Sequence, residues 1–101
     1  MPDVATQARS IAAVCGDALV GSVLRRLAEL ELGRLDLAIE RARKELVPFE
    51  SRFGRDSMAT WEAWQSGDLG DDADLMEWMA LTENFRLLLG KKAQLAASFR
   101  G

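Results

Sequence analysis

Hydrophobic residues recur at helical spacing along most of this 101-residue chain. From residue 35 onward they follow alternating intervals of four and three, the heptad pattern of a helix that packs along another helix. The residues of this seam are Leu35, Ile39, Ala42, Leu46, Phe49 and Phe53. Upstream, Leu24, Leu27 and Leu32 continue the apolar character, although the register shifts near Gly33. The pattern predicts a long helix over residues 17–53.

Two residues inside this stretch oppose a straight helix. Gly33 costs about 1 kcal/mol relative to Ala in a helix interior. Pro48 removes a backbone donor and favours a kink one turn upstream. Because the seam continues to Phe53, we expect a bend near residues 44–48 and not a break. Gly54 then occupies the position at which helices commonly end.

A short helix is predicted from Ser57 to Gln65, with Asp56 or Ser57 as its cap and Gly67 just after its end. Its large hydrophobic residues share one face because they lie three positions apart. These residues are Met58, Trp61 and Trp64.

A final helix is predicted from about residue 72 to residue 99, and Asp74 and Glu77 have the spacing of a capping pair at its start. Its inward side chains are expected to be Leu75, Trp78, Met79, Thr82, Phe85, Leu88, Leu89, Ala93, Ala96 and Phe99. The fold class that follows is all-α. We expect a long, coiled-coil-like helical hairpin over residues 17–101, with a short linking helix between its two arms.

Residues 1–16 form a separate segment that ends at Gly16. Its apolar residues also fall at helical spacing, which indicates either a short helix or an N-terminal arm. They are Val4, Ala8, Ile11, Ala12 and Cys15.

The distribution of charge bears on the kind of partner. The chain carries 13 basic and 16 acidic residues, a net charge of −3. Residues 1–55 have a net charge of +1 and residues 56–101 a net charge of −4. Neither half has the strongly basic balance of a nucleic-acid-binding surface, so we do not expect a nucleic-acid partner. The acidic second half could instead complement a basic protein.

The side chains needed for most catalysis are missing. The sequence has no His and no Tyr, and its single Cys15 has no His to activate it. No phosphate-binding loop or zinc-ligand cluster is present, so we expect neither an enzyme nor a cofactor. A lone Cys favours a reducing compartment. Because no convincing signal peptide or membrane-spanning run is present, the sequence predicts a cytoplasmic protein without a membrane partner.

Acidic residues cluster before and within the start of the last predicted helix, and three interpretations remain open. They could bind calcium or magnesium, which prefer several oxygen ligands, although the spacing departs from the standard calcium loop. They could cap the helix and favour its positive end, which is the interpretation we prefer. They could also face a basic partner. The residues are Asp68, Asp71, Asp72, Asp74 and Glu77.

Trp61, Trp64 and Trp78 are the second candidate feature. Core packing accounts for at least two of them, where the short helix closes over the hairpin. Trp is nevertheless enriched at binding hot spots, and a chain of this size has little core in which to bury three. The hypothesis is that at least one of them lines a partner surface.

A longer signature resembles a group of short bacterial and archaeal helical proteins. Members of that group carry an FExxxG…GxLGDDxDxxEW pattern. Three segments of this chain are similar to it: Phe49-Glu50-Ser51-Arg52-Phe53-Gly54, then Gly67-Asp68-Leu69-Gly70-Asp71-Asp72-Ala73-Asp74, and then Glu77-Trp78. Some of its members are encoded beside small toxin-like proteins and are suspected antitoxins. The resemblance covers roughly residues 35–90 and implies toxin binding without catalytic residues. Pro48 departs from the group, and residues 1–30 have no counterpart in it.

The leading hypothesis is therefore a non-catalytic, antitoxin-like module whose hairpin masks a partner protein, and the resemblance implies a small toxin encoded nearby as that partner. The residues expected to contact the partner are Phe49, Phe53, Trp61, Trp64, Asp68, Asp71, Asp72 and Trp78. An alternative is a homo-oligomeric scaffold in which the seam over residues 35–53 pairs with a second copy. A weaker alternative is a metal sensor that uses the cluster from Asp68 to Glu77.

Overall fold

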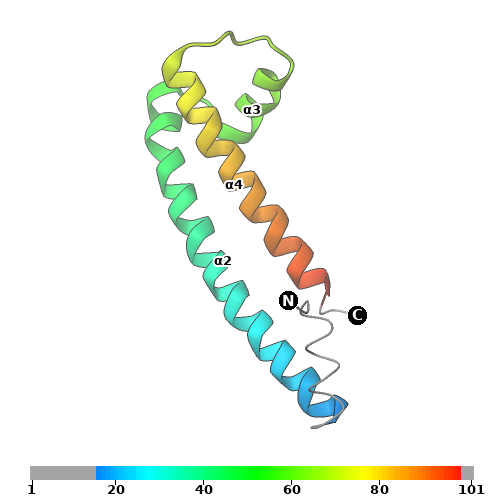
Figure 1. The fold of residues 1–101 in the computed structure, drawn as a ribbon. Coiled ribbons are helices and arrows are strands. Elements are labelled where there is room, and N and C mark those ends of the chain that lie inside the picture. The colour runs from blue at the N-terminus through cyan, green and yellow to red at the C-terminus, as the bar shows by residue number, and fades with distance from the viewer. Residues whose placement is uncertain (1–15, 99–101) are drawn as a thin grey trace.

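The computed structural model describes residues 16–98, which form a hairpin of two long helices with a short helix at the turn (Figure 1). The helices are α2 (Asp17–Phe53), α3 (Ser57–Gln65) and α4 (Ala73–Ser98). Helix α4 runs antiparallel to α2, and no strand occurs in the described part of the chain. The prediction of an all-α helical hairpin with a short linking helix is confirmed. The arm expected over residues 1–16 lies outside the described residues, apart from Gly16.

Helix α2 continues without a break through Pro48. The Pro48 ring is exposed, so it does not disturb the packed face. Arg43 and Glu50 lie on either side of it and form an ion pair, with 2.6 Å between Nη1 and Oε1. The helix ends at Gly54, which adopts a left-handed conformation and donates its backbone N–H to the Glu50 carbonyl.

The seam that the sequence predicted is the face of α2 that packs against α4. Leu35, Ala42 and Leu46 are buried, whereas Phe53 at its end is 39% exposed. Two ion pairs join the helices at widely separated levels of the hairpin: Arg52 with Asp74 at 2.8 Å and Lys92 with Asp36 at 2.6 Å.

Both helix starts at the turn are capped by an aspartate. The Asp56 side chain accepts from the Ala59 backbone N–H at the start of α3. At the start of α4, Asp72 Oδ1 accepts from the N–H groups of Asp74 and Leu75. The expectation of a capping pair at Asp74 and Glu77 is therefore wrong, because the helix begins at residue 73 and Asp72 occupies the capping position.

The most completely buried side chains lie near the hairpin turn. Fewer lie along the rest of the two-helix rod, which we call the shaft. Leu46, Trp78 and Met79 form the core near the turn, with Ser57, Thr60 and Thr82 as its buried polar members. Since the described helices extend over 58 × 24 × 22 Å, the remainder of the molecule is a two-helix rod with little interior. None of α2, α3 and α4 is long and apolar enough to cross a membrane.

Candidate functional site

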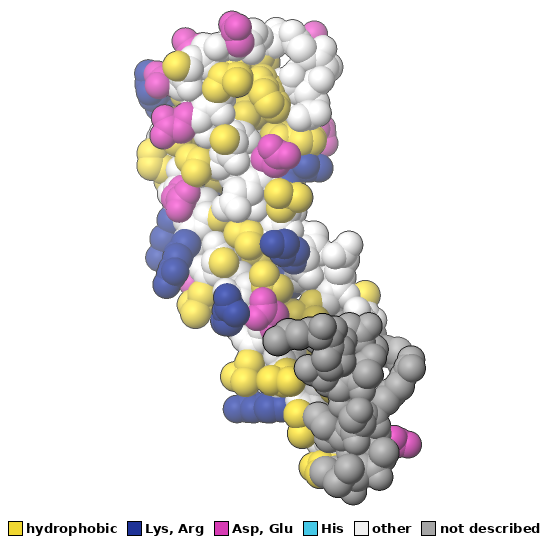
Figure 2. Space-filling view, viewed as in Figure 1, with side chains coloured by type: hydrophobic (Ala, Val, Ile, Leu, Met, Phe, Trp, Pro, Cys, Tyr) yellow, Lys and Arg dark blue, Asp and Glu magenta, His cyan; other side chains and the backbone are white. Residues whose placement is uncertain are grey.

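The residues expected to contact a partner come together at one end of the molecule. We define the turn end as residues 49–79, which comprise the last turn of α2, α3, the loop after it and the first two turns of α4. Figure 2 shows acidic and hydrophobic side chains side by side on this end. The hairpin turn brings residues separated by up to 29 positions in the sequence into one region.

Trp78 organises the interior of the turn end. Its ring stacks on Phe53 and Phe49, with centroids 5.2 and 6.2 Å away and interplanar angles of 7°. Its indole Nε1 donates to Ser57 Oγ at 2.9 Å. Only 1% of Trp78 is exposed. The structure therefore places this member of the expected contact set inside the molecule, where it offers no surface to a partner.

Trp61 and Trp64 occupy a different position, because both are only partly buried against the core from α3. The Arg86 guanidinium lies 3.5 Å from the centroid of the Trp61 ring, within the range of a cation–π interaction. Trp61 Nε1 is buried and has no hydrogen-bond partner among the described residues. These two rings are the tryptophans of the turn end that retain surface for a partner.

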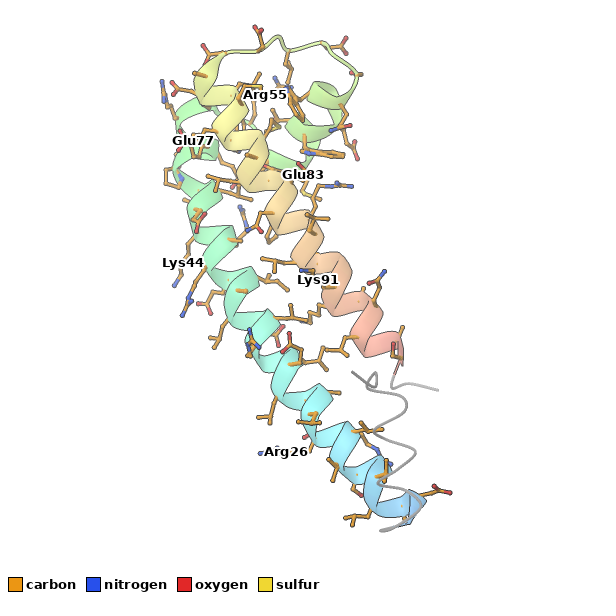
Figure 3. All side chains as sticks on the ribbon, viewed as in Figure 1. Arg26, Lys44, Arg55, Glu77, Glu83 and Lys91 are labelled. Atoms are coloured by element: carbon orange, nitrogen blue, oxygen red, sulfur yellow. The ribbon has the colours of Figure 1, made fainter. Side chains whose placement is uncertain are left out.

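A hollow of about 350 Å³ opens beside the stacked rings. Phe53 and Leu75 supply its apolar surface beside the buried Trp78, and the residues of the Arg52–Asp74 ion pair also line it. Arg55 also lines the hollow, and Figure 3 shows this residue at the turn end. The remaining lining residues are Thr60, Leu69 and Asp72. The lining is thus mixed, with four apolar residues, four charged residues and one threonine.

The acidic cluster is spread out, and its members have separate structural roles. Asp68 accepts from the Ser66 hydroxyl at 2.9 Å, Asp72 caps α4, and Asp74 pairs with Arg52. Asp71 is exposed. In residues 16–98 no three acidic, Cys or His side chains converge in a group that could hold a metal ion. The geometry thus favours capping and surface charge, and it gives the metal-sensor alternative no support.

The capping assignment makes a direct prediction. Asp72→Ala is expected to lower the free energy of unfolding by about 1 kcal/mol, because the first turn of α4 loses the acceptor for two backbone N–H groups. Urea denaturation followed by circular dichroism measures the change. Asp71→Ala is the matched control, since it removes the same charge next door and is expected to change stability by less than about 0.5 kcal/mol. Equal losses in the two variants would contradict the assignment.

Glu50 was not singled out as a site residue from the sequence, although it joins α2 to the start of α3. Its Oε2 accepts from the Ser57 backbone N–H at 2.9 Å, and its Oε1 pairs with Arg43. Burial raises the pKa of this carboxyl, but the hydrogen bonds from the Ser57 N–H, from Arg43 and from the Ser57 hydroxyl, together with the charge of Arg43, outweigh it. The pKa of Glu50 is therefore lowered from its ordinary value of 4.5.

Glu50 and Trp78 are connected through one residue, Ser57. Its Oγ accepts the indole hydrogen bond of Trp78, and its backbone N–H donates to Glu50 Oε2. Ser57 and Trp78 are each 1% exposed, so the hydrogen bond between them is shielded from water. A Ser in this position carries no sequence signal of its own, because its two partners lie seven and 21 positions away.

The seam over residues 35–53 is already occupied within the chain. Leu46, which lies in it, is completely buried and belongs to one core with Trp78 and Met79 of α4. A second copy could pair with this face only if the hairpin opened. Self-association of the closed hairpin must therefore use another surface.

Comparisons of the chain with models of protein families, with curated proteins and with solved structures find no match.

Proposed function

We propose that the protein is a non-catalytic binding module that engages another protein through its turn end. The observation that carries the proposal is the convergence there of partly exposed aromatic rings, an open hollow and a concentrated negative charge. The resemblance of the signature to suspected antitoxins suggests the class of partner, a small toxin-like protein encoded by a neighbouring gene. Binding would mask the working surface of that protein in the cytoplasm.

Charge is distributed unevenly along the molecule. The turn end has eight acidic and two basic residues, a net charge of −6. The other described residues have seven acidic and nine basic residues, a net charge of +2. A field of this kind attracts a basic surface to one end of the rod and orients it on approach. The turn end is thus matched to a basic partner.

Hydrophobic contacts at the same end would supply most of the affinity. Phe53, Met58 and Met76 are each more than a third exposed, although they are large apolar side chains. Trp61 and Trp64 add partly exposed rings, and Trp is the residue most enriched at binding hot spots. The hollow beside Phe53 is of a size to admit one side chain of the partner, which would be shielded from water there.

The proposal predicts which substitutions weaken the complex with the product of the neighbouring gene. Trp64→Ala is expected to raise the dissociation constant at least about tenfold, and Asp71→Lys to raise it severalfold with a smaller effect at high salt. Isothermal titration calorimetry on the full chain measures both changes. Circular dichroism shows whether each variant keeps its helical content.

Two control variants make comparable side-chain changes outside the turn end, and so test whether the position of the substitution matters. Leu87→Ala removes an exposed apolar side chain from α4 outside the turn end, and Glu40→Lys makes the same charge change as Asp71→Lys on the shaft. Both are expected to bind like the natural chain. The absence of any complex would defeat the antitoxin-like proposal. If only the control variants lost affinity, the interface would lie on the shaft and not at the turn end.

A further inference from the structure

A second apolar surface lies on α2, away from the face that packs on α4. Five large side chains form it, and each is 48–58% exposed: Leu19, Val23, Leu27, Leu30 and Leu37. At about 100° of rotation per residue they fall within an arc of about 80°, so they share one face of the helix. We call this set the α2 stripe. It is about 27 Å long at about 1.5 Å per residue.

Much of the α2 stripe lies where α4 does not reach. Asp36 of α2 pairs with Lys92 of α4, and six residues later α4 ends at Ser98. In an antiparallel pair this end lies at the level of about residue 30 of α2. Figure 1 shows α2 continuing beyond the end of α4, and Figure 3 shows Arg26 on this extension. Figure 2 shows hydrophobic side chains exposed on the same part of the rod.

We propose that the α2 stripe is the interface of a homodimer in which two copies pair antiparallel through it. The stripe is nearly symmetric about residue 28. A two-fold axis there places Leu19 opposite Leu37 of the second copy and Leu27 opposite Leu30 of the second copy. Apolar side chains then meet apolar side chains at both ends and at the centre. The extensions of α2 become helices of a four-helix arrangement.

The charges beside the stripe favour a second copy over a strongly charged partner. Arg26, beside the stripe, pairs with Glu29 at 3.3 Å, and Arg34, which falls inside the arc of the stripe between Leu30 and Leu37, pairs with Glu31 at 3.2 Å. Each arginine is thus balanced by a glutamate of the same helix, as a self-complementary interface needs. A basic partner would be drawn to the turn end instead, where the net charge is −6.

The negative charge of the turn end decides the direction of pairing. A parallel dimer would bring two turn ends of charge −6 side by side. In the antiparallel dimer they point in opposite directions, about 75 Å apart at about 1.5 Å per residue, and a Debye length of about 8–10 Å removes their repulsion. Both turn ends also stay free. The dimer is therefore independent of the proposed partner interface, and either idea can fail without the other.

Analytical ultracentrifugation of the full chain over about 1–300 µM tests the dimer. Five half-exposed side chains make a smaller interface than the roughly 800 Å² per partner of a standard complex, so we expect a micromolar dissociation constant. Leu30→Glu and Leu37→Glu are each expected to raise it at least tenfold. Leu87→Glu is the matched control: its leucine is as exposed as Leu37 but lies on α4 outside the stripe, and its dimer should be unchanged.

Three results would overturn the proposal. The natural chain could stay monomeric over this range of concentration, or the dimer could survive both stripe substitutions. The control variant Leu87→Glu could also weaken the dimer as much as the stripe variants do. A monomer that loses affinity for the neighbouring gene product on Leu30→Glu would assign the stripe to that protein instead. Because both stripe side chains are more than half exposed, the variants should keep their helical content, which circular dichroism checks.

Disulfide cross-linking tests the direction of pairing. In a Cys15→Ser background, chains with Leu19→Cys are mixed with chains with Leu37→Cys and oxidised. The antiparallel dimer predicts cross-links between the two kinds of chain. Cross-links that form instead between identical chains would show a parallel dimer and contradict the proposed geometry.

Discussion

Trp78→Ala is expected to lower the free energy of unfolding by about 3–5 kcal/mol, the usual cost of removing a buried large aromatic ring. The variant loses the stacks on Phe49 and Phe53 and the hydrogen bond to Ser57. A small domain is stabilised by only about 5–15 kcal/mol in total, so much of the cooperative transition should disappear. Urea denaturation followed by circular dichroism measures the change without relying on tryptophan fluorescence.

Two further variants separate the contributions of Trp78. Ser57→Ala leaves the ring in place and removes the hydroxyl that accepts its N–H, so we expect a loss of about 1–3 kcal/mol. Leu87→Ala truncates a side chain that is 58% exposed and is expected to change stability by less than about 0.5 kcal/mol. If Trp78→Ala cost no more than Leu87→Ala, the turn end would not be organised around this ring.

Glu50→Gln is expected to lower stability at neutral pH by about 1–2 kcal/mol, because two hydrogen bonds lose their charged acceptor. It should also change the dependence on pH. The pKa of Glu50 is lower in the folded chain than its ordinary value of 4.5, so the folded state favours the carboxylate. Its contribution is complete above about pH 5.5 and is lost as the pH falls below 4.5 and through the folded pKa.

The measurement is the free energy of unfolding of both chains between pH 7 and pH 3. The natural chain should lose more stability over this range than Glu50→Gln, and the two curves should approach each other at the acid end. Glu40→Gln is the control, because its carboxylate is exposed in a surface ion pair with Lys44 and should matter little. Parallel curves for the natural chain and Glu50→Gln would show that Glu50 does not act as its contacts indicate.

The long helices follow from local rules, which is why the sequence predicted them. The seam from Leu35 to Phe53 packs on α4, Gly54 ends α2, and Asp56 caps α3. Periodicity could not select between neighbouring acids at the start of α4, because Asp72 and Asp74 both suit a cap. It also could not separate two faces of α2: the shift in register near Gly33 coincides with the α2 stripe, whose Leu27 and Leu30 belong to a different face from Leu35.

Local sequence rules could not predict contacts between residues that are distant in the sequence. The chain of hydrogen bonds from Trp78 through Ser57 to Glu50 is complete only when all three helices are in place. The hollow likewise exists only after the turn has closed. Several signature residues now have structural roles, since Phe49 stacks on Trp78 and Asp72 caps α4. The signature therefore contains residues that build the turn end. The class of partner is a proposal drawn from the resemblance.

Amide hydrogen exchange of the full chain, with and without the purified product of the neighbouring gene, tests the central claim most directly. The measurement locates the interface by the residues that become protected. The account predicts slowed exchange within residues 49–79, above all in α3 and the loop that follows it, with little change along the shaft. Protection confined to residues 17–48, or no protection at a concentration of partner that saturates binding, would contradict it.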